Sequence, residues 1–280
     1  MPKHITREQK EEIVKYYKTK PMTQDEVAQK FKISLPSVIK ILKEYKVKIY
    51  NKVQLFSPNL NEHYFDIIDT EEKAYFLGLI YSDGNVREHN GGYYLSIELK
   101  REDKYILEKL AAELKCKNKI YDRDRKTNFG ESHMSNFTSC NSKKIFDDLA
   151  RFNIVPDKSH TTTSFINIEE LIPNNLIKHF LRGLIDGDGT ISKRYTTRQN
   201  AIAIYQNEIN FCYEFDRLLK KSMNDYDLYE NIIVNKNTGV YNLRYRRIDD
   251  IKKICDFLYN GSSIYLKRKY QLAELYFQEN

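Results

Sequence analysis

Residues 76–84 read FLGLIYSDG, and 105 positions further on residues 181–189 read LRGLIDGDG. Both segments are apolar at the spacing of a buried helix, and each ends in an acidic residue followed by glycine. These two acids are Asp83 and Asp188. A segment that returns at a fixed distance indicates a duplicated structural unit, so we expect the chain to contain two related halves.

Each of the two predicted helices carries small side chains at intervals of four residues. The small residues on this stripe are Gly78 and Ser82 in the first helix, and Gly183 and Gly187 in the second. Because small side chains let two backbones approach closely, we expect the helices to pack along this stripe, with Asp83 and Asp188 side by side at their C-terminal ends. A capping box of Asp69 and Glu72 is expected to start the first helix, and Asn174 to cap the second.

The similarity between the halves extends beyond these helices. The strand pattern at 95–99 is repeated at 202–204, and a helix is expected to begin near Asp103 and again near Glu208. Further strands are expected at 120–121, 134–138, 232–234 and 240–245, and further helices at 143–152 and 249–259. Each half therefore reads αββαββα, which predicts an α+β fold built from two pseudo-symmetric repeats.

The N-terminal fifth of the chain holds all of its net charge of +7. Residues 1–52 contain 13 Lys and Arg against 6 Asp and Glu, whereas the remainder contains 33 of each sign. Thr6, Thr23 and Ser34 predict the starts of three short helices, which is the spacing of a helix-turn-helix whose last helix enters the major groove. The outward side chains of that last helix, which we expect to contact DNA, are Ser37, Lys40 and Lys43.

The chain divides into four segments. We assign residues 1–50 to the helix-turn-helix domain, 51–68 to a linker, 69–165 to the first repeat and 166–280 to the second. The linker has no regular apolar period and contains Ser-Pro-Asn at 57–59. We expect it to lie extended against DNA or against the next domain.

Composition excludes several classes of protein. Apolar residues make up 41% of the 280, which is enough for a sizeable core. Four scattered cysteines with no close pair argue against zinc knuckles and against a disulfide framework. The longest apolar run, 74–81, is too short to cross a bilayer, and the charged N-terminus does not resemble a signal peptide. We therefore expect a protein without membrane contact, either cytoplasmic and associated with the nucleoid or organellar.

Two carboxylates at convergent helix C-termini point to a specific chemistry. Asp83 and Asp188 would repel each other and would also face the negative end of each helix dipole. A hard divalent cation such as Mg²⁺ removes this conflict and accepts further oxygen ligands from water and phosphate. Metal-assisted hydrolysis of a phosphodiester follows from such a site, with both acids as metal ligands and catalytic residues.

The two segments resemble the paired LAGLIDADG motifs of single-chain homing endonucleases, and the likeness spans about residues 65–280. The second copy fits closely, whereas in the first copy Tyr81 replaces the sixth-position Asp and Phe76 the opening Leu. The resemblance implies that Asp83 and Asp188 bind the catalytic metals. It also implies a saddle of antiparallel strands over the major groove of double-stranded DNA. A monomer would then cut both strands at a long, imperfectly palindromic site and leave short 3′ overhangs.

The resemblance also implies a lysine near each scissile phosphate. Lys158 follows the closing helix of the first repeat, 75 residues after the motif acid, and Lys267 follows that of the second, 79 residues after its acid. Family members place a lysine there to polarise the attacking water or to steady developing charge. Arg268 and Lys269 are alternatives to Lys267.

The predicted sheets also supply candidates for reading DNA. Arg suits bidentate contacts to guanine, Gln suits adenine, and Lys suits phosphate. The candidates are Arg123 and Arg125 in the first half, and Lys193, Arg194, Arg198, Gln199, Arg244 and Arg246 in the second.

Other functions fit the same scaffold. A transcription regulator that has lost cleavage is expected to lose at least one motif acid, and this chain retains both. An intron maturase would bind RNA, which the DNA-type helices at the N-terminus disfavour. We do not expect an intein, because neither Met1 nor the Glu279–Asn280 end resembles a splice junction. A site-specific DNA endonuclease is therefore the preferred interpretation.

Overall fold

The structure is a computed structural model. It describes residues 5–19, 23–47, 59–117, 120–127, 130–138, 141–156, 168–193 and 200–278. Two separate hydrophobic cores are present in these ranges. The smaller core lies within residues 13–47, and the larger one extends from Tyr64 to Tyr276 and takes side chains from both repeats. The repeats therefore form one packed unit.

The N-terminal unit consists of three helices, as predicted: α1 (Arg7–Thr19), α2 (Gln24–Phe31) and α3 (Leu35–Glu44). Thr23 and Glu26 form the complete capping box of α2, and Ser34 caps α3 by accepting a hydrogen bond from the backbone of Ser37. Val38 at the centre of α3 is fully buried. The apolar faces of these helices thus build the small core, and their polar faces are left for solvent or a partner.

The first repeat follows the expected order of elements. It runs α5 (Glu71–Asp83), β1 (Gly84–His89), β2 (Gly92–Lys100), α6 (Lys104–Glu113), β3 (Tyr121–Thr127), β4 (Gly130–Thr138) and α7 (Lys143–Ala150). A single 3₁₀ turn, η1 (Arg101–Asp103), joins β2 to α6. The αββαββα prediction is confirmed for this half.

The second repeat has the same order. It runs α9 (Asn174–Asp188), β5 (Gly189–Ser192), β6 (Ala201–Gln206), α10 (Ile209–Met223), β7 (Glu230–Val234), β8 (Tyr241–Tyr245) and α11 (Ile248–Tyr259). A short helix, α8 (Ile168–Leu171), precedes it, and α12 (Lys267–Phe277) follows it. No helix in the described ranges is both long and apolar enough to span a membrane.

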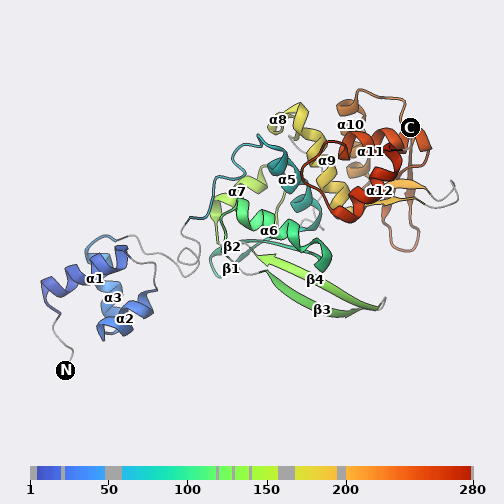
Figure 1. Cartoon of the computed structure of the whole chain (residues 1–280). Coiled ribbons are helices and arrows are strands. Elements are labelled where there is room, and N and C mark those ends of the chain that lie inside the picture. The colour runs from blue at the N-terminus through green and yellow to red at the C-terminus, as the bar shows by residue number, and fades with distance from the viewer. Residues whose placement is uncertain are drawn as a thin grey trace.

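The two sheets are antiparallel and have matching topology, β1-β2-β4-β3 and β5-β6-β8-β7. Their registers also match, because Gly84 pairs with Ile97 in the first sheet and Gly189 pairs with Ile204 in the second. Helices cover one face of each sheet, and α5 and α9 lie side by side at the centre of the unit (Figure 1). Among the residues that the structure describes, no helix lies on the opposite face of the first sheet (Figure 1).

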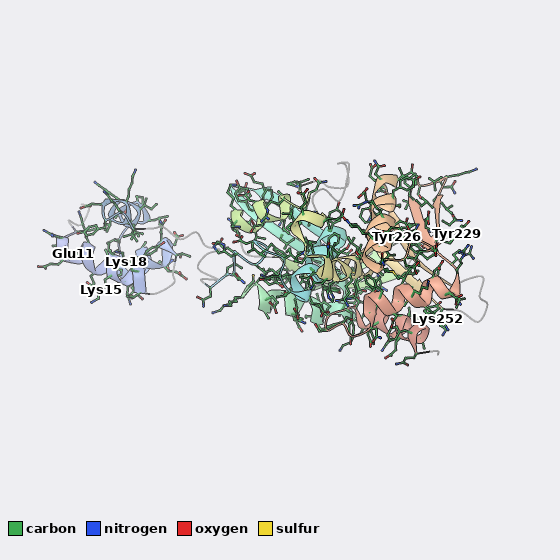
Figure 2. The ribbon with its side chains drawn as sticks, turned by 90° about the horizontal axis from the view of Figure 1, so that it is seen from above. Glu11, Lys15, Lys18, Tyr226, Tyr229 and Lys252 are labelled. Carbon is green, nitrogen blue, oxygen red and sulfur yellow. The ribbon has the colours of Figure 1, made fainter. Side chains whose placement is uncertain are left out.

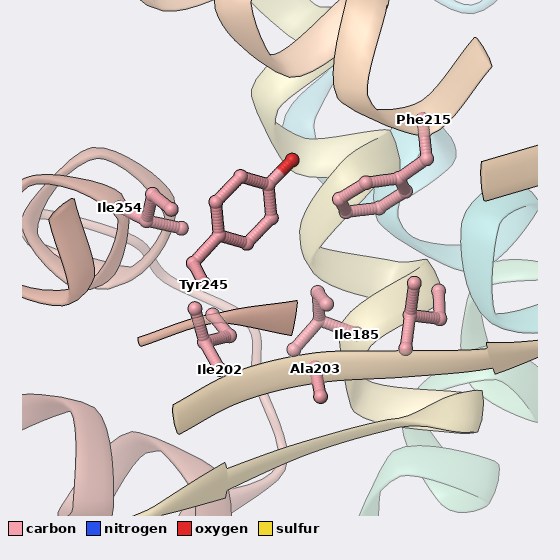
Figure 3. Close-up of a pocket in the computed structure, with 7 residues that line it drawn as sticks. Ile185, Ile202, Ala203, Phe215, Tyr245 and Ile254 are labelled. Carbon is pink, nitrogen blue, oxygen red and sulfur yellow. The ribbon is translucent and has the colours of Figure 1, made fainter. Parts of the chain in front are cut away.

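The interior of the second repeat is closely packed. Ile185 of α9, Phe215 of α10 and Tyr245 of β8 line a small gap between the sheet and its helices (Figure 3). This gap has no room for a water molecule. It is therefore part of the hydrophobic core.

Three details differ from the sequence-based expectations. Thr70 caps α5 by accepting a hydrogen bond from the Lys73 backbone, and Asp69 instead forms an ion pair with the Lys73 side chain at 2.7 Å. Asn174 is already the first residue of α9, so it cannot cap that helix. In the predicted linker, the Asn61 backbone N–H donates to the Leu114 carbonyl oxygen at 2.9 Å. Three further side chains of that segment, Tyr64, Phe65 and Ile68, are buried in the large core. The last residues of the expected linker therefore pack with the first repeat.

Candidate active site

The two motif helices are in backbone contact. A Cβ atom added to Gly78 would lie 2.1 Å from the carbonyl oxygen of Phe180, and one added to Gly183 would lie 2.3 Å from that of Tyr75. Real Cβ atoms do not approach so closely, so only glycine fits at these positions. The structure places the stripe of small residues at the helix interface, as expected from its spacing.

The close approach brings the two motif acids together. A Cβ atom on Gly187 of α9 would lie 1.9 Å from the Ser82 hydroxyl and 3.0 Å from a carboxylate oxygen of Asp83. Asp83 is the last residue of α5, and Asp188, next to Gly187, is the last residue of α9. Both acids are partly exposed. Two carboxylates from different halves of the chain therefore reach solvent at one place.

Gln206 is part of this site although it was not among the predicted residues. Its side-chain amide donates a hydrogen bond to Asp188 Oδ2 at 2.5 Å. Gln206 ends β6, where Ile202 and Ile204 point into the core. A polar residue at the next inward position of an alternating strand is a signal that sequence reasoning could have used.

Lys269 of α12 is 4% exposed and lies beneath the end of α9. Its ammonium group donates hydrogen bonds to the carbonyl oxygens of Ile185 (2.6 Å), Asp186 (2.5 Å) and Gly189 (2.8 Å). Burial lowers its pKa to about 8, although the negative charge of Asp186 opposes this shift. The two motif acids oppose it too, which places the lysine within electrostatic reach of both.

Lys267, the predicted catalytic lysine of the second half, lies elsewhere. Its exposed ammonium group sits over the ring of Tyr105, 4.7 Å from the centroid, and Arg268 pairs with Asp103 at 2.9 Å. Residues two apart on a helix point about 200° away from each other, so 267 and 269 cannot face the same group. The alternative weighed for this position, Lys269, is the one beside the motif acids. Lys158 lies outside the described residues.

A buried carboxylate holds Lys269 and the motif helix together. Asp186 accepts hydrogen bonds from the hydroxyls of Tyr75 (2.8 Å) and Tyr259 (2.7 Å) and from the backbone of Leu266 (2.7 Å). Burial raises the pKa of this carboxyl group. The bond to Leu266 fixes the chain immediately before α12, and therefore fixes the helix that carries Lys269.

A second buried network joins the start of α5 to the same C-terminal segment. Arg182 is fully buried and donates to Glu71 Oε1 at 2.7 Å and to the carbonyl oxygens of Leu258 (2.8 Å) and Ile264 (2.9 Å). Burial and the Arg182 charge lower the pKa of neighbouring His179 to about 4. This network was not anticipated. Its signal was an arginine inside an otherwise apolar motif.

The predicted DNA-contacting residues of the sheets have different environments. Arg123 is exposed on β3, and Arg246 is exposed just beyond β8, where Arg244 is half-buried. Lys193 is half-buried and donates to the Leu275 carbonyl oxygen of α12 at 2.7 Å, and its contact with DNA stays a prediction. The positions outside the described residues or side chains are Arg125, Arg194, Arg198 and Gln199.

The three residues of the N-terminal unit that are predicted to contact DNA also differ in their environments. Lys40 and Lys43 are exposed on α3. Ser37 is half-buried, with its hydroxyl 2.8 Å from that of Ser34 at the start of the helix, so it serves the cap. Two further exposed lysines, Lys15 and Lys18, extend from α1 (Figure 2). These four exposed lysines are therefore accessible to a polyanion.

Comparisons with known proteins agree with this fold. Residues 175–258 match a family model described as a LAGLIDADG-like domain. The homing endonuclease I-WcaI, solved bound to its DNA recognition sequence, superposes with a TM-score of 0.53 over 79% of this chain and 98% of that one, at 17% identity. No curated protein matches the chain.

Two other solved structures are similar at lower TM-scores. I-DmoI, in complex with DNA and Mn, has a TM-score of 0.46 and 20% identity over 69% of this chain and 98% of that one. Full-length DUF199/WhiA from Thermatoga maritima has a TM-score of 0.45 and 18% identity over 79% of this chain and 66% of that one. Residues 175–258 are thus a LAGLIDADG-like domain, and the two repeats together have the fold of a LAGLIDADG homing endonuclease.

Proposed function

We propose that the chain is a monomeric, divalent-metal-dependent endonuclease that cuts double-stranded DNA at a specific site. The observation that carries the proposal is the convergence of Asp83 and Asp188 at the adjoining ends of α5 and α9. The repeats present one such acid each, so a single chain offers a carboxylate to each strand of a duplex. The solved relative I-WcaI was bound to its DNA recognition sequence, which supports duplex DNA as the substrate.

The residues present fit a magnesium ion. The site offers two partly exposed carboxylates, Asp83 and Asp188, and an approach from solvent. Mg²⁺ prefers such sites, because it keeps several waters and uses one or two carboxylates together with substrate phosphates. A zinc site would need more protein ligands.

Residues of the chain would bind the cation, orient its ligands and compensate charge. A bound cation would supply an activated water and stabilise the leaving oxygen. Asp83 and Asp188 would hold it, and Gln206 fixes the orientation of Asp188 through its 2.5 Å hydrogen bond. The Lys269 ammonium offsets the negative end of the α9 dipole, which lowers the cost of placing Asp188 there. Its positive charge also favours a phosphate at the same place.

The N-terminal unit is proposed to lengthen the contact with DNA. Its exposed lysines on α3, Lys40 and Lys43, suit phosphate contacts, which add affinity without base recognition. Its separate core allows it to act as a module of its own. We therefore assign it mainly to affinity.

The decisive experiment replaces Asp188 by Asn. Asp188→Asn keeps the shape and the Gln206 contact but removes a metal-binding charge, so DNA binding should stay within about twofold while double-strand cleavage falls by at least about a hundredfold. Gel shift and cleavage of one duplex pool measure the two effects. Asp147→Asn, at an exposed ion pair with Lys143, is the matched control and should cut normally. Normal cutting by Asp188→Asn would reject the proposal, and a wild type that binds but never cuts would favour a transcription regulator.

A further inference from the structure

The residue that orients Asp188 has an apolar counterpart in the first repeat. In the shared register of the two sheets, Ile97 of β2 corresponds to Ile204 of β6. Two residues further along each strand, Leu99 therefore corresponds to Gln206. The pairing of both strands with the next strand of their sheet gives the same correspondence.

The two side chains have different chemistry at this position. The Gln206 amide donates to Asp188 Oδ2 at 2.5 Å, and both residues are partly exposed, so this hydrogen bond lies at the site itself. Leu99 is 4% exposed and belongs to the large core. Its side chain has no hydrogen-bonding group, so it cannot orient Asp83 in the way that Gln206 orients Asp188.

The ends of the two motif helices differ as well. Two residues before the acid of α9, Asp186 accepts a hydrogen bond from the Leu266 backbone at 2.7 Å. Two residues before the acid of α5, the ring of Tyr81 packs against that of Phe180. Hydrogen bonds have a preferred angle, whereas apolar contact is non-directional. Both differences predict that the acid of the second repeat is held in one orientation more firmly than that of the first.

This asymmetry concerns the order of cutting. We propose that the two strands of the duplex are cut in a fixed order, with the strand served by Asp188 first and a nicked duplex as the intermediate; the inference rests on the DNA-cutting function proposed above. A carboxylate that is already oriented need not be ordered when the phosphate arrives, so the Asp188 side reaches the reacting geometry more readily. Gln206 is then a positioning residue that decides which strand is cut first.

The chemistry is the same on both strands. Each cut hydrolyses one phosphodiester bond, in which water adds its hydroxyl to phosphorus and a proton to the leaving sugar oxygen. The nicked duplex is the state in which one of the two bonds has been hydrolysed. Loss of a hydrogen-bond partner of a metal-binding group typically costs 10-fold to 100-fold in activity or metal affinity, so we expect the two strands to differ by at least about tenfold in rate.

Strand-resolved cleavage tests this order. The full chain, in excess over a duplex that carries one cleaved site and a different fluorophore at each 5′ end, is mixed with Mg²⁺, and denaturing gels follow both strands. The wild type should accumulate nicked duplex before the double-strand break. Gln206→Leu should slow the faster strand alone, by about tenfold to a hundredfold. Gln271→Leu, the same change at an exposed position of α12, is the matched control and should alter neither rate.

The reciprocal exchange is the sharper form of the test. Leu99→Gln combined with Gln206→Leu moves the amide donor to the first repeat, so the order of cutting should reverse. An unchanged order in this double variant, or a Gln206→Leu variant that slows the other strand, would overturn the proposal. If the double variant fails to fold, the single Gln206→Leu variant still decides.

A second readout does not depend on cutting. Gln206→Met keeps the length of the side chain and removes the amide, so the melting temperature should stay close to that of the wild type. Calorimetric titration of Ca²⁺ into the complex of chain and duplex should show an affinity about tenfold lower than in the wild type. A lower melting temperature with equal slowing of both strands would show a structural role and reject the proposal, as would an unchanged Ca²⁺ affinity.

The outcomes distinguish this proposal from the one on which it depends. A wild type that cuts neither strand would reject the nuclease, and the order of cutting with it. A wild type that makes a site-specific double-strand break at equal rates on both strands would reject only the order and the role of Gln206.

Discussion

The two repeats share a topology and a register, yet their motif helices are held at the end by different means. At the end of α9, Asp186 accepts three buried hydrogen bonds and Lys269 covers the last carbonyl groups. The equivalent place in α5 holds Tyr81, whose ring packs against Phe180 (6.1 Å between centroids) and Phe211 (6.0 Å). A polar anchor in one half thus corresponds to an aromatic anchor in the other. The motif acid therefore has the same position in both repeats, whereas the residues that hold the end of its helix differ.

The feature that both halves share should be the least tolerant of change. Gly183→Val places side-chain atoms against the backbone of α5, so we expect the free energy of unfolding to fall by more than about 3 kcal/mol. Ala112→Val, at an exposed position of α6, is the control and should cost less than about 1 kcal/mol. Denaturant unfolding measures both. Similar losses in the two variants would show that the helix contact is not what holds the repeats together.

The polar anchor should matter more than the hydroxyl of the aromatic one. Asp186→Ala leaves the hydroxyls of Tyr75 and Tyr259 and the Leu266 N–H without an acceptor in the core, so we expect a loss of about 3 kcal/mol. Tyr81→Phe keeps the ring contacts and should cost about 1 kcal/mol or less. Equal effects in a parallel denaturation series would mean that the two ends are not supported differently.

The pH dependence of stability also distinguishes the two halves, because Lys269 belongs to the second half only. Lys269 has a folded pKa of about 8 against 10.5 as its ordinary value, so between these values the unfolded chain binds more protons. Its contribution to stability should therefore rise with pH across this window, by up to about 3 kcal/mol. The stability difference between wild type and Lys269→Met isolates that contribution from other titrating groups. A stability difference that stays constant across this pH window would contradict the assignment.

The fold was readable from sequence because its signals are local and are repeated. The 105-residue spacing and the period of the small residues fix the helix pair, and strand alternation at residues such as Leu95 fixes the faces of the sheets. The motif acids followed from the same logic. Repetition supplied the second observation that a single Asp-Gly turn lacks.

The supports of the site could not be read in the same way. The choice between Lys267 and Lys269 depends on where α12 begins, and the ends of helices are poorly defined by sequence. For the same reason, the sequence predicted Asp69 as the cap of α5, whereas the neighbouring Thr70 caps it. Asp186 and Arg182 bind partners more than 70 residues away, and no short-range pattern encodes such pairs.

The smallest expected effect concerns the N-terminal unit, which we expect to add affinity for DNA, whereas the paired repeats set the cut position. The double variant Lys40→Gln with Lys43→Gln removes two exposed charges of α3. If each lysine contacts one phosphate, the plot of log affinity against log salt should become less steep, with a slope smaller in magnitude by about 2. The cut position should not move, because these contacts carry no base information. Lys253→Gln, at an exposed ion pair with Asp225, is the control and should leave the slope unchanged. A changed cut position would mean that α3 reads bases, and the N-terminal unit would then share in specificity and not only in affinity.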